Sequence, residues 1–173
     1  MLLREKTVRE ITLYVNGREY NLPVGEGKHF VHSSETLAYT LRERLELTGL
    51  KIGCDRGVCG SCTVVMDGDA VSSCMILTVD CEDRNITTIE GLTDPDTGDL
   101  SKLQQSFVER TGYQCGFCTP GIIMAAKALL DKNSHPTEEE VREALAGNYC
   151  RCGTHYTAVE SIMAHIHEGE DSL

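Results

Sequence analysis

The feature that most constrains this chain is its set of nine cysteines within 173 residues. They lie at positions 54, 59, 62, 74, 81, 115, 118, 150 and 152. Disulfide frameworks are typical of short secreted domains, whereas this count is odd and Met1 to Glu10 contain no apolar core of a signal peptide or twin-arginine leader. In a reducing cytoplasm, where we expect this chain, such cysteines bind metal or carry out redox chemistry. The cysteines therefore predict metal or redox sites rather than disulfide bridges.

A first cysteine set has the spacing of an iron–sulfur loop. Cys54, Cys59 and Cys62 form C-x4-C-x2-C, and Cys74 follows after eleven further residues. This is the plant-type ferredoxin spacing, in which one loop curls around a [2Fe–2S] cluster because its three thiolates must reach two iron atoms. Glycines at positions 53, 57 and 60 permit positive φ and a close approach of backbone N–H groups to the sulfurs. Zinc prefers paired C-x2-4-C sequences, so a zinc site fits this loop less well.

A second cysteine set has a less specific spacing. Cys115 and Cys118 form C-x2-C, and Cys150 and Cys152 form C-x-C after 31 intervening residues. Four such thiolates could also hold zinc, and a C-x2-C pair could be a thioredoxin-like motif, although the βαβ pattern that this motif needs is absent from the sequence. Helical periodicity places the first pair at the start of one helix and the second pair after the end of the next helix. Because these helix ends meet at one end of a bundle, we predict a second four-thiolate site.

The two sets lie in halves with different predicted secondary structure. Alternating apolar residues and Asn-Gly and Asp-Gly turns predict strands at 8–15, 20–24, 63–66, 70–74 and 86–89, with a helix over 35–47. A small mixed sheet crossed by one helix is the β-grasp pattern of plant-type ferredoxins. After a linker at 91–101, helices are predicted near 101–111 and 156–167. Two more are predicted between them, one with Thr119 as its cap and Pro120 at its first helical position, and one opened by the capping box of Thr137 and Glu140. We therefore predict an α+β protein, with a β-grasp ferredoxin-like domain over residues 1–92 and an all-α four-helix bundle domain over residues 93–173.

Charge and hydropathy exclude two classes of partner. The chain has 16 Lys and Arg against 27 Asp and Glu, a net charge of −11, whereas a nucleic-acid binder needs a basic face. No apolar run approaches the roughly 18–20 residues of a membrane span. No nucleophile–base pair or carboxylate dyad stands out, and substrate chemistry would need a cofactor for which the sequence has no binding motif. We therefore expect an electron conduit rather than a catalyst in its own right.

Two further motifs carry a resemblance to a known family. Gln114–Gly121 has the sequence Q-C-G-F-C-T-P-G, and Gly147–Cys152 has the pattern G-N-x-C-R-C. Together with the plant-type loop, over about residues 8–167, they resemble the small iron–sulfur subunit of the xanthine oxidase, or molybdenum hydroxylase, family. The resemblance implies an electron-transfer subunit of a multi-subunit oxidoreductase. The alternative is a freestanding ferredoxin with one [2Fe–2S] cluster and a structural zinc in the helical bundle.

The resemblance also implies roles for individual residues. The ligands of the first [2Fe–2S] cluster would be Cys54, Cys59, Cys62 and Cys74, and those of the second would be Cys115, Cys118, Cys150 and Cys152. The second cluster would lie beside the pterin of a molybdenum cofactor in a separate large subunit, with Gln114 hydrogen-bonded to the pterin and Cys152 near its amino group. Electrons would pass from molybdenum through the second and first clusters, usually to FAD in a medium subunit.

Three features lie outside this pattern. Cys81 matches no ligand position and is predicted to be a free, partly buried thiol. Many family members continue with T-G-Y after the last cysteine, whereas this chain has Gly153-Thr154-His155-Tyr156, and we predict a packing or capping role for His155 at a helix start. The stretch 23–33 is longer than usual for the family and is predicted to be a surface loop insertion.

Overall fold

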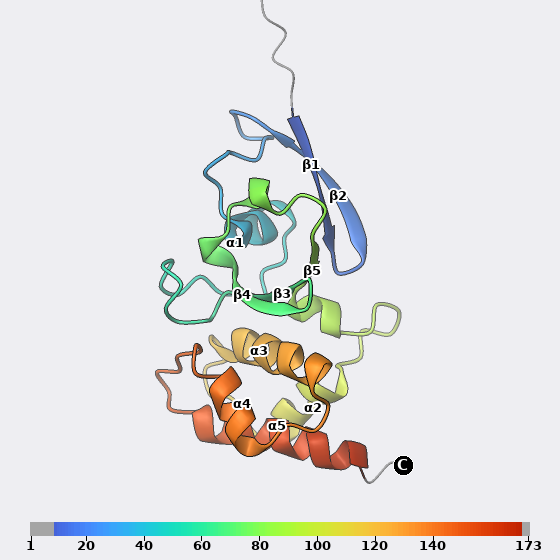
Figure 1. The fold of residues 1–173 in the computed structure, drawn as a ribbon, viewed down its shortest axis with the longest axis vertical. Coiled ribbons are helices and arrows are strands. Elements are labelled where there is room, and N and C mark those ends of the chain that lie inside the picture. The colour runs from blue at the N-terminus through green and yellow to red at the C-terminus, as the bar shows by residue number, and fades with distance from the viewer. Residues whose placement is uncertain (1–8, 171–173) are drawn as a thin grey trace, which may run out of the picture.

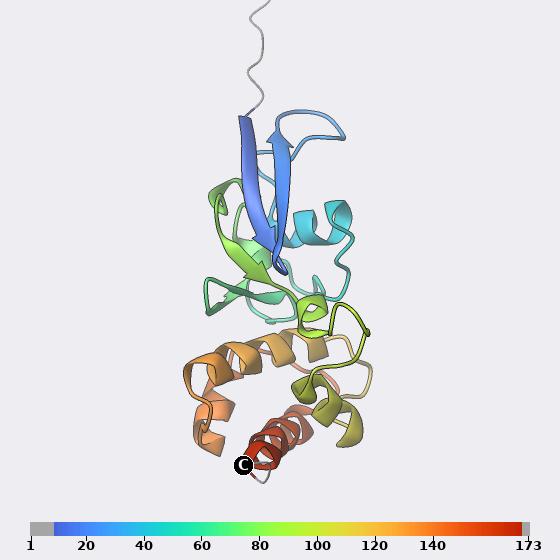
Figure 2. The same ribbon diagram turned by 90° about the vertical axis from the view of Figure 1, so that its right-hand side faces the viewer.

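The computed structural model describes residues 9–170, so the stretch up to Val8, for which we predict no leader and the start of the first strand, lies outside the described residues. The described chain divides into a sheet half, from β1 to β5, and a helical half, from α2 to α5. Figures 1 and 2 show the two halves stacked along the long axis, with α3 facing the sheet half. This order of a mixed sheet followed by helices confirms the α+β class.

The sheet half contains two hairpins joined by a short central strand. β1 (Arg9–Val15) and β2 (Arg18–Val24) form the first hairpin, and β3 (Thr63–Met66) and β4 (Asp69–Ser72) form the second. β5 (Asn85–Thr87) lies parallel to β1 and antiparallel to β3, which gives the strand order β2-β1-β5-β3-β4. The predicted turns at 16–17 and 67–68 have positive φ at both positions, as type I′ geometry requires.

Two predicted strands end earlier than expected. The strand predicted over 70–74 stops at Ser72, and Cys74 lies instead on a single 3-10 turn, Ser73–Met75. The strand predicted over 86–89 stops at Thr87 because the backbone N–H of Thr88 donates to the Asn16 side chain (2.9 Å) instead of to a neighbouring strand.

The helix predicted over 35–47 is shorter and less regular than expected. α1 spans only Leu37–Tyr39 and continues as one π-helical turn over Thr40–Arg44, in which the Leu45 N–H donates to the Thr40 carbonyl (3.1 Å). Its first turn is capped by Thr36, and the helical turns end where Glu46 takes a φ of 58°. Leu37 and Leu41, four residues apart, still face the core and are fully buried.

Four helices make up the helical half within the described residues. They are α2 (Lys102–Glu109), α3 (Thr119–Lys132), α4 (Glu138–Ala144) and α5 (His155–Glu170). Both hydrogen bonds of the capping box predicted at Thr137 and Glu140 are present. α3 begins one residue earlier than predicted, because Cys118 rather than Thr119 occupies the N-cap position.

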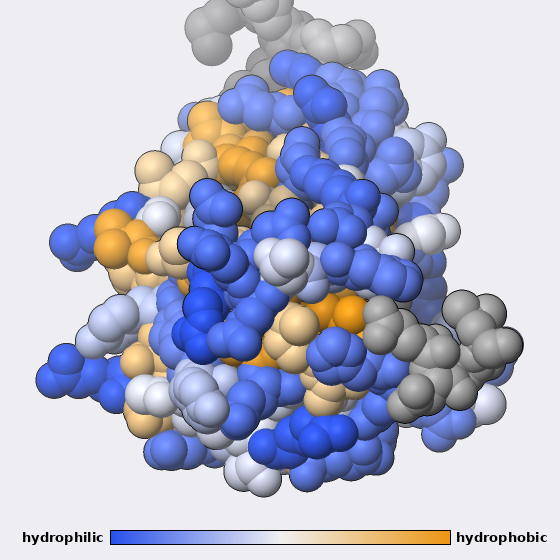
Figure 3. Space-filling model, turned by 60° about the horizontal axis from the view of Figure 1, so that its bottom comes forward, coloured by the Kyte–Doolittle hydropathy of each residue, from blue (hydrophilic) through white to orange (hydrophobic). Residues whose placement is uncertain are grey.

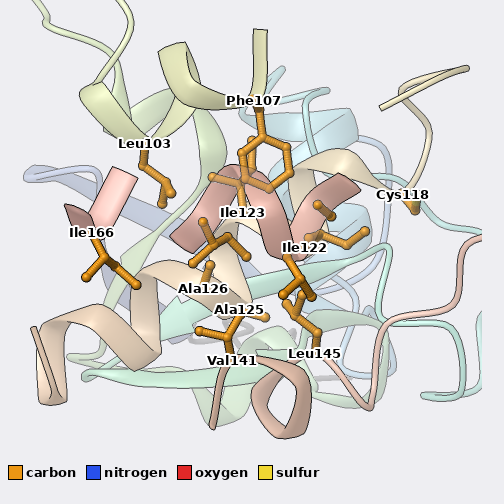
Figure 4. Packing of buried hydrophobic residues seen from close by; sticks show 13 residues of the cluster. Leu103, Phe107, Cys118, Ile122, Ile123, Ala125, Ala126, Val141, Leu145 and Ile166 are labelled. Carbon is orange, nitrogen blue, oxygen red and sulfur yellow. The ribbon is translucent and has the colours of Figure 1, made fainter. Parts of the chain in front are cut away.

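The helical half has its own core, and α3 also belongs to the contact with the sheet half. Figure 4 shows Phe107, Ile122, Val141 and neighbouring side chains gathered between the helices, with Cys118 at the edge of this cluster. On the opposite side of α3, Met124 and Ala128 pack against Val65 of β3. Cys118, at the N-cap of α3, therefore belongs both to the helical core and to the second cysteine set.

Figure 3 shows the hydropathy of one face of the molecule, with the helical end turned forward. Hydrophilic residues cover most of this face, and hydrophobic areas lie between them. No helix in the described part of the chain is both long and apolar enough to cross a membrane.

Candidate metal centres

The loop that carries Cys54, Cys59 and Cys62 is curled by residues in the left-handed region. Asp55, Gly57 and Gly60 have φ values of 53°, 72° and 66°. Gly53 does not have a positive φ, and it serves the close approach that was the other expectation for these glycines. A Cβ atom at Gly53 would lie 3.2 Å from Cys59 Sγ and 3.3 Å from Cε1 of Phe117. The missing side chain therefore lets the loop approach the second cysteine set.

Backbone N–H groups point at a sulfur of this loop, as predicted. The N–H groups of Val58 and Cys59 donate to Cys54 Sγ at 3.3 and 3.4 Å. Backbone N–H groups of Arg56 and Val58 lower the pKa of Cys54 to about 7. The loop thus stabilises negative charge on this sulfur, which is the form that binds metal.

Cys62 and Cys74 form the inner side of the first set. Both are buried, Cys62 just before β3 and Cys74 on the turn after β4. The hydroxyl of Ser73 donates to the carbonyl of Cys62 (2.6 Å), which ties the two segments together. Burial, with a hydrogen bond to Cys62, raises the pKa of Cys74 to about 11.

The second set gathers residues from two connections in the helical half. Cys115 and Cys118 enclose Gly116, whose φ is 79°, and Cys150 and Cys152 lie between α4 and α5. The sulfurs of Cys115 and Cys152 are 3.5 Å apart.

Burial and hydrogen bonds act differently on the two other thiols of the second set. Burial, with a contact to Cys150, raises the pKa of Cys118 to about 12. Burial also opposes ionisation of Cys150, but hydrogen bonds from Thr154 lower its pKa to about 7, and the Thr154 hydroxyl lies 3.0 Å from this sulfur.

The cysteines contact each other in pairs. These pairs are Cys54 with Cys59, Cys62 with Cys74, Cys115 with Cys152, and Cys118 with Cys150. Across residues 9–170, no group of three or more His, Cys, Asp or Glu side chains is placed to hold one metal ion. Four thiolates in each set are the number that the two irons of a [2Fe–2S] cluster share.

The two sets share one cavity, which the sequence did not predict. A cavity of about 420 Å³ is lined by Cys54 and Cys59 of the first set and by all four cysteines of the second set. The Tyr149 N–H donates to the Cys59 carbonyl (2.9 Å), and the Asn148 side chain donates to the Gly60 carbonyl (3.0 Å). The sequence feature that could have indicated this contact is Asn148 of the G-N-x-C-R-C motif, because this asparagine is not one of the predicted cluster ligands.

The remaining predicted residues lie as follows. Gln114 is exposed beside the exposed Cys115 and Cys152. Cys81 is fully buried, its thiol donates to the Leu77 carbonyl (3.4 Å), and burial raises its pKa to about 11, so it lies apart from both sets. His155 is the first residue of α5, which agrees with a place at a helix start.

Comparison with known proteins identifies the family. Residues 13–100 match the model of a 2Fe-2S iron-sulfur cluster binding domain, and residues 88–163 match that of a [2Fe-2S] binding domain. Over 154 residues the chain is 47% identical to the nicotine 6-hydroxylase small subunit of Paenarthrobacter nicotinovorans, which covers 89% of this chain and 87% of that protein. The chain belongs to the small iron–sulfur subunits of the molybdenum hydroxylase family.

Two further relatives agree with this assignment. This iron–sulfur subunit is 43% identical over 145 residues to the nicotinate dehydrogenase small FeS subunit of Eubacterium barkeri, covering 83% of this chain and 90% of that one. A chain of quinoline 2-oxidoreductase from Pseudomonas putida 86 matches it with a TM-score of 0.84 at 38% identity, covering 96% of this chain and 98% of that one. The iron–sulfur subunit is thus an electron-transfer component of an oxidoreductase, and the freestanding ferredoxin alternative is not supported.

Proposed function

We propose that this chain relays single electrons between a molybdenum–pterin site in a large partner subunit and a flavin in a medium subunit or another acceptor. It would do so through two [2Fe–2S] clusters, one in a β-grasp domain over residues 1–92 and one in a four-helix bundle domain over residues 93–173. The ligands would be the cysteines of the first and second sets. The observation that carries the proposal is the hydrogen bond from Tyr149 to Cys59, which joins the two sets across a shared cavity.

The cysteines are arranged to hold clusters and to tune them. A bound cluster supplies one-electron redox chemistry, and its potential depends on hydrogen bonds to the sulfurs, burial and local charge. N–H donors at Cys54 favour the more negative, reduced form. Burial of Cys62, Cys74 and Cys118 excludes water from the inner side of each site.

The main chain offers a short connection between the sets. From Cys59 Sγ the covalent path reaches the Cys59 carbonyl, which accepts the Tyr149 N–H, and Tyr149 is bonded to Cys150. A single hydrogen bond is therefore the only non-covalent step between a ligand of the first set and a ligand of the second set.

Exposed residues beside each set support two partner surfaces. Gln114 lies with Cys115 and Cys152 on an exposed edge, where we propose that Gln114 hydrogen-bonds the pterin and Cys152 approaches its amino group. Next to the first set, Val58 and Met75 have exposed side chains, and Met75 lies against Gly57, the neighbour of Val58. We propose that these apolar side chains receive the flavin subunit or another acceptor.

Metal analysis of the anaerobically purified chain tests this function. About four irons and four sulfides per chain are expected, and two irons with one zinc would contradict the proposal. Dithionite reduction should give two distinct EPR signals. Cys118→Ser should remove one of them, whereas the matched control Cys81→Ser should leave both unchanged because Cys81 lies outside both sets.

A further inference from the structure

The stretch that the sequence presents as a surface loop insertion is tied to one partly buried guanidinium, that of Arg44. Arg44 donates to the carbonyls of Lys28 (3.2 Å) and Phe30 (2.5 Å). Backbone hydrogen bonds from Gly25 to Val31 (3.0 Å) and from Val31 to Pro23 (2.8 Å) close the loop. The segment is therefore held in place by Arg44 rather than lying free on the surface.

The same guanidinium forms an unusually buried ion pair. Nε and Nη2 of Arg44 each donate to a carboxylate oxygen of Glu35 at 2.6 Å. The side chains are 19% and 7% exposed, while each of seven other ion pairs in the described chain has a member at least 44% exposed. Burying a charged pair costs desolvation energy, so a pair kept in such a place is better explained by the geometry it fixes than by stability.

That geometry extends from Glu35 to the segment after Cys74. The Thr40 hydroxyl donates to Glu35 (2.6 Å) and lies 2.7 Å from the Thr78 hydroxyl, and both threonines are fully buried. The Thr78 N–H donates to the Glu35 carbonyl (2.9 Å). Two residues further along, the Leu37 N–H donates to the Ile76 carbonyl (2.8 Å).

Cys74 is the member of the first set that depends most on this support. The other three cysteines belong to the 54–62 loop, whereas Cys74 arrives on a separate one-turn element that leads directly into residues 76–78. The Ser73 hydroxyl ties this turn to Cys62 on one side, and the anchoring of residues 76–78 holds it on the other side.

We propose that Arg44 and Glu35 are positioning residues for the first cluster, acting through residues 76–78 to hold Cys74 opposite Cys62. The proposal rests on the first cluster of the proposed function. It also gives the 23–33 stretch a role, because its carbonyl groups fix the guanidinium that orients Glu35.

EPR of the full chain carrying Arg44→Ala, purified anaerobically and reduced with dithionite, tests the proposal. Variants Cys59→Ser and Cys118→Ser first assign the two signals. Arg44→Ala should broaden or abolish the first-cluster signal and lower iron from about four to about two per chain, with the second-cluster signal unchanged. Arg44→Lys, which keeps the charge but not the two-pronged geometry, should lose less of the signal.

Two controls separate positioning from general destabilisation. Arg84→Ala removes an exposed ion pair with Asp67 in the same sheet half and should leave both signals intact. If Arg44→Ala does not yield folded protein, Glu35→Gln keeps the size and the acceptor for Thr40 and should still perturb the first signal alone.

The outcomes distinguish this proposal from the proposed function. A wild-type chain with one signal would refute the two-cluster function itself. A wild-type chain with both signals, together with Arg44→Ala or Glu35→Gln variants that keep both, would overturn only the positioning role. Equal loss of the two signals would also overturn it, because the role predicts a selective effect.

Discussion

Gly60→Ala tests how tightly the two halves are locked at the shared cavity. Gly60 has a φ of 66°, and a Cβ atom there would lie 2.5 Å from the carbonyl oxygen of Gly147 and 3.0 Å from Cα of Asn148. Both neighbours are backbone, so relief requires the two loops to move apart. That movement would break the hydrogen bonds from Asn148 to Gly60 and from Tyr149 to Cys59.

The expected cost can be separated into strain and lost contacts. A non-glycine residue in the left-handed region costs about 1–2 kcal/mol. Two lost hydrogen bonds, at about 0.5–1.5 kcal/mol each, add about 1–3 kcal/mol. Gly68 provides the matched control, because its φ is 90° and a Cβ atom there would meet nothing within 4 Å, so Gly68→Ala carries the strain alone.

Thermal unfolding of the two variants measures the difference. For a difference of about 2 kcal/mol, the Tm of Gly60→Ala should fall about 4–8 °C below that of Gly68→Ala. Magnetic coupling between the reduced clusters should weaken in Gly60→Ala only. Equal Tm values for the two variants would refute the argument that the loops are locked at this point.

Three further results are expected. Burial alone would raise the pKa of Glu35, but hydrogen bonds from Arg44 and Thr40 bring it below its ordinary value. The resulting stabilisation is present above the unfolded pKa of about 4.3 and is lost as pH falls through the lower folded pKa. The free energy of unfolding from urea titrations should therefore fall less steeply with decreasing pH in Glu35→Gln than in the wild type. An unchanged pH dependence would contradict this role of the Glu35 carboxylate. Met124→Ala opens a cavity between α3 and the sheet and should cost about 2–5 kcal/mol in urea titrations, with a loss below about 1 kcal/mol counting against this packing. Because its thiol is buried with a pKa of about 11, Cys81 should escape iodoacetamide at pH 8 in the folded chain, and mass-spectrometric detection of its alkylation would show the opposite.

Features set by a few neighbouring residues could be predicted from the sequence. The Asn16-Gly17 turn and the Thr137 capping box depend on φ preferences and on hydrogen bonds within four residues, and both occur where predicted. The grouping of the cysteines follows from spacing in the same way. The ligand roles of these cysteines stay a prediction until iron is measured.

Features set by distant residues could not be predicted. The π-helical turn at Thr40–Arg44 replaces a regular helix where the Thr40 hydroxyl bonds Glu35 and approaches Thr78, 38 residues away. The strand through Thr87 ends early because of Asn16, which lies in the turn after β1. The role of Gly53 depends on Phe117 in the other half of the chain. In each case the deciding partner is remote in sequence, so local propensity carries no signal of it.

The bond between Tyr149 and Cys59 is made by peptide groups alone, and this limits what substitution can do to it. The ring of Tyr149 takes no part in that bond, and the residue is 56% exposed. Nineteen of the twenty amino acids carry the amide hydrogen that is needed, and only proline lacks it. The side chain at position 149, the x of the G-N-x-C-R-C pattern, can thus be substituted to suit a partner surface while the backbone hydrogen bond to Cys59 is kept.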